Sequence, residues 1–316
     1  MNGVSRREFI RLGAAAFAGA ALPSFAEMCH GASDLSFERL ELKVGAKKPF
    51  GALHFSDPHL TLMSAAEQKT DEIRQIFKER VPVFPQNVVN FTATLDYASE
   101  KGLFPICSGD VIDYVSEANQ AFVRRSFAPF RGRMICSMGN HEYWDPIGNR
   151  PCARLREILS APFGNDLTVS SHIVNGVNIV AVDDGVEQIG EEASRRVKKE
   201  FEKGLPVVLV THQPFYLPGL FHEVWVTKNA KGRSGTASLV GVPEDKLAEY
   251  RPDQISYARP RPSTLAFLAW LRQQPRLKAI LCGHTHSYWQ ERFSETAVQY
   301  VVGGNFRGSG YEILFT

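Results

Sequence analysis

The stretch SGDVID, residues 108–113, directly follows the apolar run Leu103–Cys107. A short apolar run that ends in Gly-Asp indicates a buried strand that delivers a carboxylate to the edge of a sheet. That carboxylate is Asp110, and we place it at the centre of the predicted site because other apolar runs of the chain end in similar residues.

Four further apolar runs are each followed by polar side chains. They are Phe50–Phe55 before Asp57 and His59, Arg133–Met138 before Asn140 and His141, Val207–Val210 before His212, and Leu277–Cys282 before His284 and His286. In open α/β sheets, ligands bind just beyond the carboxyl ends of the strands. We therefore predict that these side chains meet Asp110 at one edge.

Apart from His141, the gathered residues are two Asp, one Asn and four His. Oxygen ligands suit hard cations, whereas imidazole suits zinc, iron and manganese, so the mixture indicates transition metals rather than calcium. A lone His after a strand, or a lone Gly-Asp pair, usually has only a structural role. The combination instead predicts a two-metal hydrolase, because two ions about 3.5–4 Å apart can clamp a phosphoryl group during in-line displacement.

The composition is that of an ordinary globular protein, with 44% hydrophobic and 22% charged residues in a chain of 316. Of 36 basic and 34 acidic residues, three Arg and one Glu lie in the first 26 positions, which leaves 33 of each sign. A near-neutral mature chain argues against a nucleic-acid partner. Five cysteines suggest no disulfide framework, although a pair between Cys29 and Cys152 stays open.

The N-terminus has the pattern of an export signal. Basic residues in the segment 5–11, SRREFIR, precede the apolar run Leu12–Leu22, and small residues at Ser24 and Ala26 fit a cleavage site. The paired arginines resemble a twin-arginine signal, and the run is shorter than the roughly 20 apolar residues of a membrane span. We predict a signal peptide over residues 1–26, export by the twin-arginine machinery to the periplasm or exterior of a bacterium, and no membrane span after cleavage; an uncleaved anchor is the alternative.

Strands alternate with helices along the remaining chain, which predicts a single α/β domain over residues 27–316. The other predicted strands are Phe37–Val44, Ser170–Val174, Val177–Val182, Val298–Val302 and Tyr311–Phe315, and the predicted helices are Asn87–Glu100, Ser116–Phe127, Cys152–Leu159, Glu191–Lys203 and Pro262–Gln273. Asn175-Gly176 predicts a type I′ hairpin turn. Ser116 and Ser263 are candidate helix caps, and the charged segment Glu191–Lys203 is most simply a solvated face.

A long insertion at about residues 213–262 is rich in Gly, Pro and basic side chains. A loop of this length inside a compact domain is usually functional. Two interpretations stay open, a decorated surface loop and a lobe that faces the substrate. In the second, the possible substrate contacts are His222, Trp225, Tyr250 and Tyr257.

The order of the motifs resembles the calcineurin-like metallophosphoesterase family. The motifs are Asp-x-His, Gly-Asp-x-x-Asp, Gly-Asn-His-Glu, a His after a strand and Gly-His-x-His, from Asp57 to His286. The resemblance implies an α/β fold, a four-layer α-β-β-α sandwich of two mixed sheets flanked by helices. It also implies a dinuclear centre of divalent or mixed-valence manganese, iron or zinc.

The resemblance further implies a role for each residue of the site. One metal would be held by Asp57, His59, Asp110 and His286, and the other by Asp110, Asn140, His212 and His284. Asp110 would bridge the two ions. His141 would contact the phosphate and protonate the leaving group, which suits a side chain whose pKa lies near working pH.

Four more carboxylates lie outside the predicted ligand sets. Asp113 and Glu142 could orient metal-bound histidines, as carboxylates commonly do, or they could be a local turn and a surface acid. Asp183 and Asp184 follow a predicted strand and are interpreted as turn or substrate-lip residues. Purple acid phosphatases have a tyrosine ligand three residues after the bridging aspartate and lack the histidine present here as His59; Asp113 at the tyrosine position therefore excludes that subgroup.

These inferences predict an exported phosphoester hydrolase in which a hydroxide bridging two metal ions attacks phosphorus in line. Phosphodiesters are slightly preferred as substrates, and a phosphomonoesterase is the alternative. A non-catalytic metal-binding scaffold is a third possibility, disfavoured because every ligand position is filled. The expected substrate is a phosphorylated small molecule or a lipid-derived one, and a nuclease is disfavoured by the neutral charge and the export signal.

Overall fold

The computed structural model describes residues 33–148, 150–186, 188–227, 238–250, 255–256 and 258–316. The strands in this part of the chain are β1 (Ser36–Leu42), β2 (Phe50–Phe55), β3 (Phe104–Cys107), β4 (Ile135–Cys136), β5 (Val169–Val174), β6 (Val177–Val182), β7 (Val207–Val210), β8 (Leu277–Cys282), β9 (Trp289–Arg292), β10 (Val298–Val301) and β11 (Ser309–Phe315).

The longer helices are α3 (Asp71–Arg80), α4 (Asn87–Glu100), α5 (Glu117–Phe127), α6 (Cys152–Phe163), α7 (Glu191–Glu202) and α11 (Pro262–Arg272). Short helical turns are η1 (Glu67–Lys69), η2 (Ala128–Phe130), η3 (His141–Tyr143), α8 (Pro218–Phe221), η4 (His222–Thr227), η5 (Glu244–Glu249) and η6 (Asn305–Arg307). None of the helices in the described ranges combines the length and apolar composition needed to span a bilayer.

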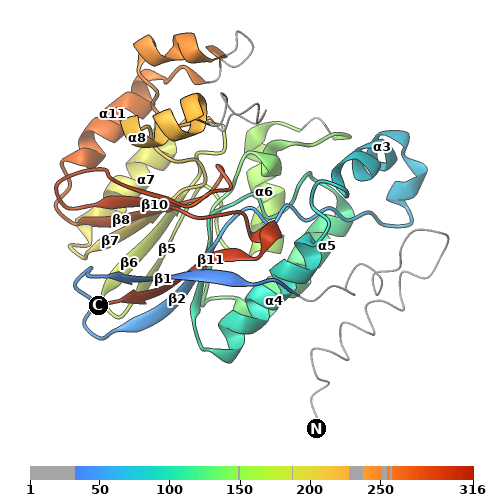
Figure 1. Ribbon diagram of the computed structural model, residues 1–316, viewed down its shortest axis with the longest axis horizontal. Helices are drawn as coiled ribbons and strands as arrows, with labels where there is room; N and C mark the ends of the chain where they lie inside the picture. The colour runs from blue at the N-terminus through green and yellow to red at the C-terminus, as the bar shows by residue number, and fades with distance from the viewer. Residues whose placement is uncertain (1–32, 149, 187, 228–237, 251–254, 257) are drawn as a thin grey trace.

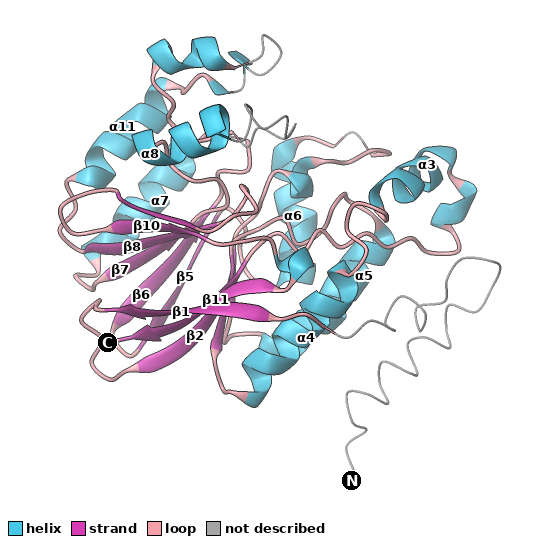
Figure 2. Cartoon of the chain, viewed as in Figure 1, coloured by secondary structure: helices cyan, strands magenta, loops and turns pink. Residues whose placement is uncertain are grey.

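The strands form two mixed sheets, with the orders β1-β11-β2-β3-β4 and β5-β6-β7-β8-β10-β9. In the first sheet β2, β3 and β4 are parallel, and β11 pairs antiparallel with β2. In the second sheet β6, β7, β8 and β10 are parallel, and β5 and β9 pair antiparallel at its two edges. Helices α7 and α11 lie over one outer face and α4 and α5 over the other (Figure 1 and Figure 2).

The period-2 alternation of side chains along each strand builds these layers. In β6, Val177, Ile179 and Ala181 join the core between the two sheets, whereas Val180 and Val182 join the core beneath α7 and α11. All five side chains are buried, and each fully buried Val or Ile contributes about 1.5–3 kcal/mol to folding. The arrangement confirms the predicted four-layer α-β-β-α sandwich.

Most of the predicted elements are confirmed to within a few residues, including the edge strand β1 and the β5–β6 hairpin. Asn175 and Gly176 have φ angles of 47° and 84°, as a type I′ turn requires. Ser116 caps α5 by accepting a hydrogen bond from the backbone N–H of Asn119. Strand β9 was not predicted, because its sequence WQER has no apolar alternation.

Two local predictions are wrong. Ser263 does not cap α11; Arg261 occupies the cap position, and the hydroxyl of Ser263 donates instead to the carbonyl of Ile189. The segment Glu191–Lys203 is more than a solvated face, because Val197 and Phe201 on α7 are buried in the core. The prediction missed this apolar stripe because most residues of α7 are charged.

The described parts of the predicted insertion pack against the second sheet. Phe215, Leu220 and Leu239 are buried in the core that α7 and α11 also line. Trp225 and Tyr250 are each 4% exposed, and their ring centroids lie 3.8 Å apart. The prediction that these two aromatics contact substrate is therefore wrong; they anchor the insertion.

Several predictions fall on residues outside the described ranges. The signal peptide over residues 1–26, Cys29 and Tyr257 are among them. His222 and Cys152 are described, and both are exposed. Export, the disulfide alternative and the division into a signal and one domain thus stay predictions.

Candidate metal centre

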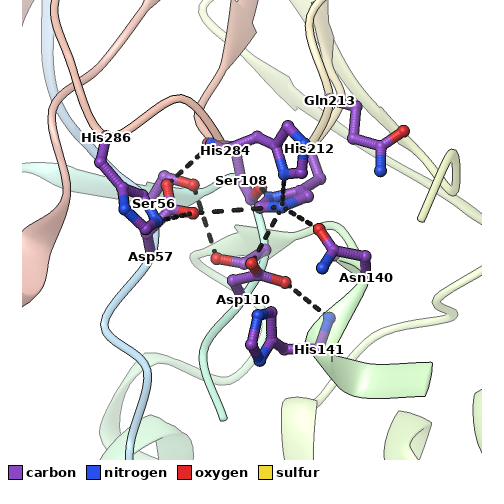
Figure 3. Close-up of polar contacts among 12 residues, drawn as sticks. Ser56, Asp57, Ser108, Asp110, Asn140, His141, His212, Gln213, His284 and His286 are labelled. Carbon is purple, nitrogen blue, oxygen red and sulfur yellow. Dashed lines mark hydrogen bonds and ion pairs between the residues drawn. The ribbon is translucent and has the colours of Figure 1, made fainter. Parts of the chain in front are cut away.

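Five strand-to-loop junctions from the two sheets meet at one end of the sandwich. The loops after β2, β3 and β4 come from the first sheet, and those after β7 and β8 come from the second. All seven predicted ligands and His141 lie in these loops. Figure 3 labels His141 and all of these ligands except His59, and it shows the carboxylate of Asp110 between Asp57 and His286 on one side and His212 and Asn140 on the other.

The backbone at this end is held in an unusual conformation. Asp57, His59, Asp110, His284 and His286 have positive φ angles of 57°, 50°, 49°, 68° and 53°. Non-glycine residues rarely adopt this left-handed region, and each one costs of the order of 1–3 kcal/mol. Such strain typically marks functional sites, and here it falls on five of the seven predicted ligands.

Gly109 explains why a glycine precedes the central carboxylate. Its φ angle is 96°, and a Cβ built on it would lie 2.7 Å from the backbone nitrogen of Gly139 and 2.9 Å from Nδ1 of His212. No side chain fits there without moving the loop that carries Asn140. The glycine therefore lets three of the five loops approach one another closely.

The first group of ligands contains Asp57, His59 and His286. Nε2 of His286 lies 3.3 Å from Oδ1 of Asp57 and 3.0 Å from Nε2 of His59. Nε2 of His59 is 3.8 Å from Oδ1 of Asp57 and 3.8 Å from Oδ2 of Asp110. The candidate ligand atoms near Nε2 of His59 are thus Nε2 of His286, Oδ1 of Asp57 and Oδ2 of Asp110.

The second group contains His212, Asn140 and His284. Nε2 of His212 lies 3.1 Å from Oδ2 of Asp110, 3.2 Å from Oδ1 of Asn140 and 3.1 Å from Nδ1 of His284. The same oxygen of Asp110 therefore faces both groups. This is the arrangement that a bridging ligand needs.

The donor set fits a pair of cations. Oδ1 of Asp57 is buried and has no hydrogen-bond donor among the described residues, although three imidazoles lie within 4.0 Å of it. Two pairs of imidazole nitrogens also face each other at about 3 Å. A buried carboxylate oxygen without a donor, beside two closely spaced pairs of imidazole nitrogens, is explained by cations between these groups.

The electrostatics of the cluster favour bound positive charge. Burial opposes charge on Asp57 and Asp110, but the surrounding histidines outweigh it, and the pKa of each carboxyl lies below its usual value. Burial lowers the pKa of His59 to about 4 and that of His284 to about 3. For His212, the carboxylate of Asp110 outweighs burial and raises the pKa. Ionised carboxylates beside the neutral imidazoles of His59 and His284 are the states that metal ligands require, and a cation bound beside His212 would displace its proton.

His141 lies beside the first group, with its ring centroid 4.5 Å from that of His59, and its ligand atom is close to those of His59 and Asp110. Its backbone N–H donates to Oδ1 of Asp110 at 2.9 Å. Its Nδ1 lies 2.7 Å from the carbonyl oxygen of Asp113 and 3.0 Å from a carboxylate oxygen of the same residue. Burial opposes its charge, but Asp110 and Asp113 together raise its pKa to about 9. The ring of His141 is therefore held in one orientation by Asp113.

Asp113 serves both histidines on the same side of the site. Its Oδ1 lies 3.3 Å from Nδ1 of His59 and 3.0 Å from Nδ1 of His141. The side chain is fully buried. Of the two interpretations of Asp113, orientation of a candidate metal ligand fits these contacts and a plain turn residue does not.

Arg80 and Phe84 complete this region, and neither was predicted to belong to the site. Nε and Nη2 of Arg80 each lie 2.7 Å from a different oxygen of Asp113. The ring of Phe84 stacks on that of His59 with centroids 4.4 Å apart and planes 2° apart. Arg80 ends α3, 33 residues before Asp113, so no local signal in the sequence relates the two.

We expect Arg80→Met to lower kcat for phosphoester hydrolysis about 10–100-fold, the usual cost of losing a partner that orients metal ligands. The substitution leaves Asp113 buried with an unpaired charge, so that carboxylate no longer holds His59 and His141 in place. Arg80→Lys restores one of the two contacts and should recover part of the activity. Steady-state kinetics and metal content measured by mass spectrometry check this.

The matched control is Arg74→Met on the same helix, because Arg74 pairs only with Asp71 and other exposed groups near α3 among the described residues. Equal losses in Arg74→Met and Arg80→Met would show a general effect on α3 and would contradict the positioning role.

Glu142 and Asp184 position the loops through their backbones. Glu142 accepts hydrogen bonds from the N–H groups of Asp110 at 3.0 Å, Gly139 at 2.7 Å and Ile112 at 3.1 Å. It therefore ties two of the loops together. Of the interpretations left open for Glu142, a surface acid is wrong because the side chain is fully buried, and the bond to Gly139 is that of a local turn. Burial raises its pKa to about 7.

Asp184 does the same for the loop after β7. It is fully buried and accepts from the backbone N–H groups of His212 at 3.0 Å and Gln213 at 3.1 Å. Asp183 instead contacts the hydroxyl of Tyr143 at 2.5 Å and Arg156 at 3.0 Å. Of the two interpretations, turn or substrate-lip residue, the second is thus wrong for Asp184, whose carboxylate is fully buried.

Comparisons with known proteins agree with this geometry. A family model described as calcineurin-like phosphoesterase matches residues 52–288. Similar solved structures include a dimetal phosphatase from Danio rerio, with 11% identity over 83% of this chain and 91% of that one and a TM-score of 0.47. A Thermus thermophilus protein has 11% identity over 82% of this chain and 91% of that one, with a TM-score of 0.46.

A 5′-nucleotidase from Candida albicans has 14% identity over 86% of this chain and a TM-score of 0.39, and this chain covers 47% of its length. The chain thus spans about half the length of that nucleotidase. No curated protein sequence matches the chain.

Proposed function

The chain belongs to the calcineurin-like phosphoesterase family, and from this premise we propose that it hydrolyses phosphoesters with two metal ions. One ion would be held by Asp57, His59, Asp110 and His286, and the other by Asp110, Asn140, His212 and His284. The observation that carries the proposal is the position of Oδ2 of Asp110, 3.8 Å from Nε2 of His59 and 3.1 Å from Nε2 of His212.

Two such ions, when bound, supply a nucleophile derived from water at neutral pH and neutralise charge on the phosphoryl group during in-line displacement. The chain's own residues supply the rest. Asp110 keeps the two sites at a fixed separation, and Glu142 and Asp184 hold the loops on either side of it. These three carboxylates are themselves buried.

His141 is the proposed general acid. Its Nδ1 is occupied by Asp113, so Nε2 is the nitrogen that can give a proton to the leaving oxygen. Asp113 in turn is held by Arg80. The imidazolium therefore keeps its Nδ1–H on Asp113, and its ring is held in one orientation before substrate binds.

We further propose that the substrates are phosphodiesters of small or lipid-derived molecules, with monoesters as the alternative, and that manganese, iron or zinc fills the sites. The proposal includes export by the twin-arginine route to the periplasm or exterior. A purely metal-binding scaffold is disfavoured because every proposed ligand position is filled and His141, the proposed general acid, is present and oriented by Asp113.

The test is hydrolysis of bis-p-nitrophenyl phosphate beside p-nitrophenyl phosphate by purified protein stripped of metal and reloaded with manganese, iron or zinc. We expect diester turnover that disappears with chelation and returns with metal. Turnover of the monoester alone would favour a phosphomonoesterase. Two bound metals without turnover of either ester would contradict a general phosphoesterase.

A further inference from the structure

Several exposed apolar residues belong to chain segments that adjoin the candidate metal centre. Within the described residues, seven large apolar side chains are exposed: Val83, Trp144, Ile147, Ile173, Val186, Leu265 and Leu314. Four of the seven, which we call the apolar rim, come from segments that adjoin site residues: Val83, Trp144, Ile147 and Val186. Their exposed fractions are 51%, 36%, 55% and 37%.

Each rim segment is tied to the site by a contact. The ring of Trp144 lies 6.1 Å from that of His141, and Ile147 follows in the same loop. Val83 precedes Phe84, whose ring stacks on His59. Val186 follows Gly185, where a Cβ would lie only 2.6 Å from the carbonyl oxygen of Gly139.

Single exposed apolar residues are common on proteins, but a cluster at one functional edge usually marks a contact with a ligand. The ligand groups of this site are suited to a charged phosphoryl group. Among the rim side chains, only the indole N–H of Trp144 is a donor and none is an acceptor, so the rim gives a sugar hydroxyl or a charged base little to bind. Binding of an apolar substituent against the rim is favourable, because apolar surface is removed from water.

We propose that the apolar rim binds the alcohol part of the substrate, and that this part is an alkyl or aryl group rather than a sugar. The inference rests on the proposed function, because it assumes that the phosphoryl group lies at the metal centre. Trp144 lies on the side of His141, the proposed proton donor. The apolar alcohol is therefore placed as the leaving group.

The reaction is a hydrolysis that balances without a further reactant. Oxygen from water forms a bond to phosphorus, the bond between phosphorus and the alcohol oxygen breaks, and that oxygen keeps the electron pair. His141 gives it a proton, and the alcohol leaves along the rim.

The test measures binding apart from turnover. Methyl-, butyl- and octylphosphonate are titrated by calorimetry into the full-length protein loaded with manganese. We expect the affinity to rise about two- to fourfold for each added methylene, as expected for partial to full burial of a CH₂ group. In the double variant Val83→Ser/Ile147→Ser, which removes two rim side chains and leaves Trp144 beside His141, the rise should fall to less than about twofold per methylene.

The matched control is Ile173→Ser/Leu314→Ser, which removes two similarly exposed apolar side chains on β5 and β11. It should keep the wild-type dependence on chain length. Two results would overturn the proposal. One is an affinity that does not change from methyl- to octylphosphonate, and the other is a rise in affinity per methylene that is the same in the rim variant as in the wild type.

Hydrolysis of bis-p-nitrophenyl phosphate by the same preparations separates the two hypotheses. Normal turnover with a flat phosphonate series overturns the apolar rim and leaves the proposed function standing. A steep phosphonate series in a protein that hydrolyses no ester supports the rim as a binding surface and contradicts the proposed function.

Discussion

Replacing Asp110 with Asn is expected to lower kcat about a thousandfold. The substitution removes the charge of the oxygen that faces both ligand groups. Metal-assisted stabilisation of transition-state charge is worth several kcal/mol, and about 4 kcal/mol corresponds to about three orders of magnitude in rate. Because the carboxamide is nearly isosteric with the carboxylate that it replaces, the loops should keep their conformation.

Two measurements separate this effect from misfolding. Mass spectrometry of the purified variant should find fewer than two metal ions per chain, while the far-UV circular dichroism spectrum stays that of the wild type. Asp71→Asn, which changes an exposed carboxylate on α3, is the matched control and should keep full activity. A fully active Asp110→Asn variant with two ions would refute the bridging role.

Replacing His141 with Ala is expected to lower kcat by about 10²–10⁴-fold for esters with poor leaving groups, the usual contribution of a general acid. The loss should be smaller, about tenfold, for p-nitrophenyl esters, because p-nitrophenolate leaves without a proton. Metal content should stay at the wild-type value, since both proposed ligand sets exclude His141. Rates for phenyl and p-nitrophenyl esters with each variant check this.

His172→Ala is the matched control, because His172 lies on β5 and contacts the carbonyl of Gly132, away from the site. A loss in His141→Ala that is equal for good and poor leaving groups would argue against proton donation. It would indicate that His141 binds the phosphoryl group in a way that does not depend on the leaving group.

The sequence predicted that the candidate ligands lie close together, because each of them follows directly after an apolar strand. Parallel neighbouring strands bring their carboxyl ends together, so local patterns were enough to place Asp57 and Asp110 at one edge of the first sheet. His212 follows a strand of the second sheet, so its place beside them depends on how the two sheets dock. The four layers were implied by the family resemblance, whereas the residues themselves indicated single elements such as the apolar run 177–182 that forms β6.

The surroundings of the site were missed because they depend on packing between distant segments. Arg80 meets Asp113 only through the tertiary placement of α3, a contact without a local signal. Trp225 and Tyr250 were misassigned because aromatic residues in a Gly- and Pro-rich stretch can face either substrate or core. Asp184 follows a strand as the ligands do, and only the backbone N–H groups from which it accepts reveal its role.

The loops that form the candidate centre come from both sheets, and this has a consequence for folding. His284 and Asp57 are joined by a hydrogen bond across 227 residues, so the ligand sets close only after the two sheets have docked. Bound ions would then act as a cross-link between sheets, one that an unfolded chain cannot form. At a free metal concentration about one hundred times Kd, such selective binding adds about 2.7 kcal/mol of stability per site. Metal supply would thus govern how long the folded enzyme persists, as well as how fast it works.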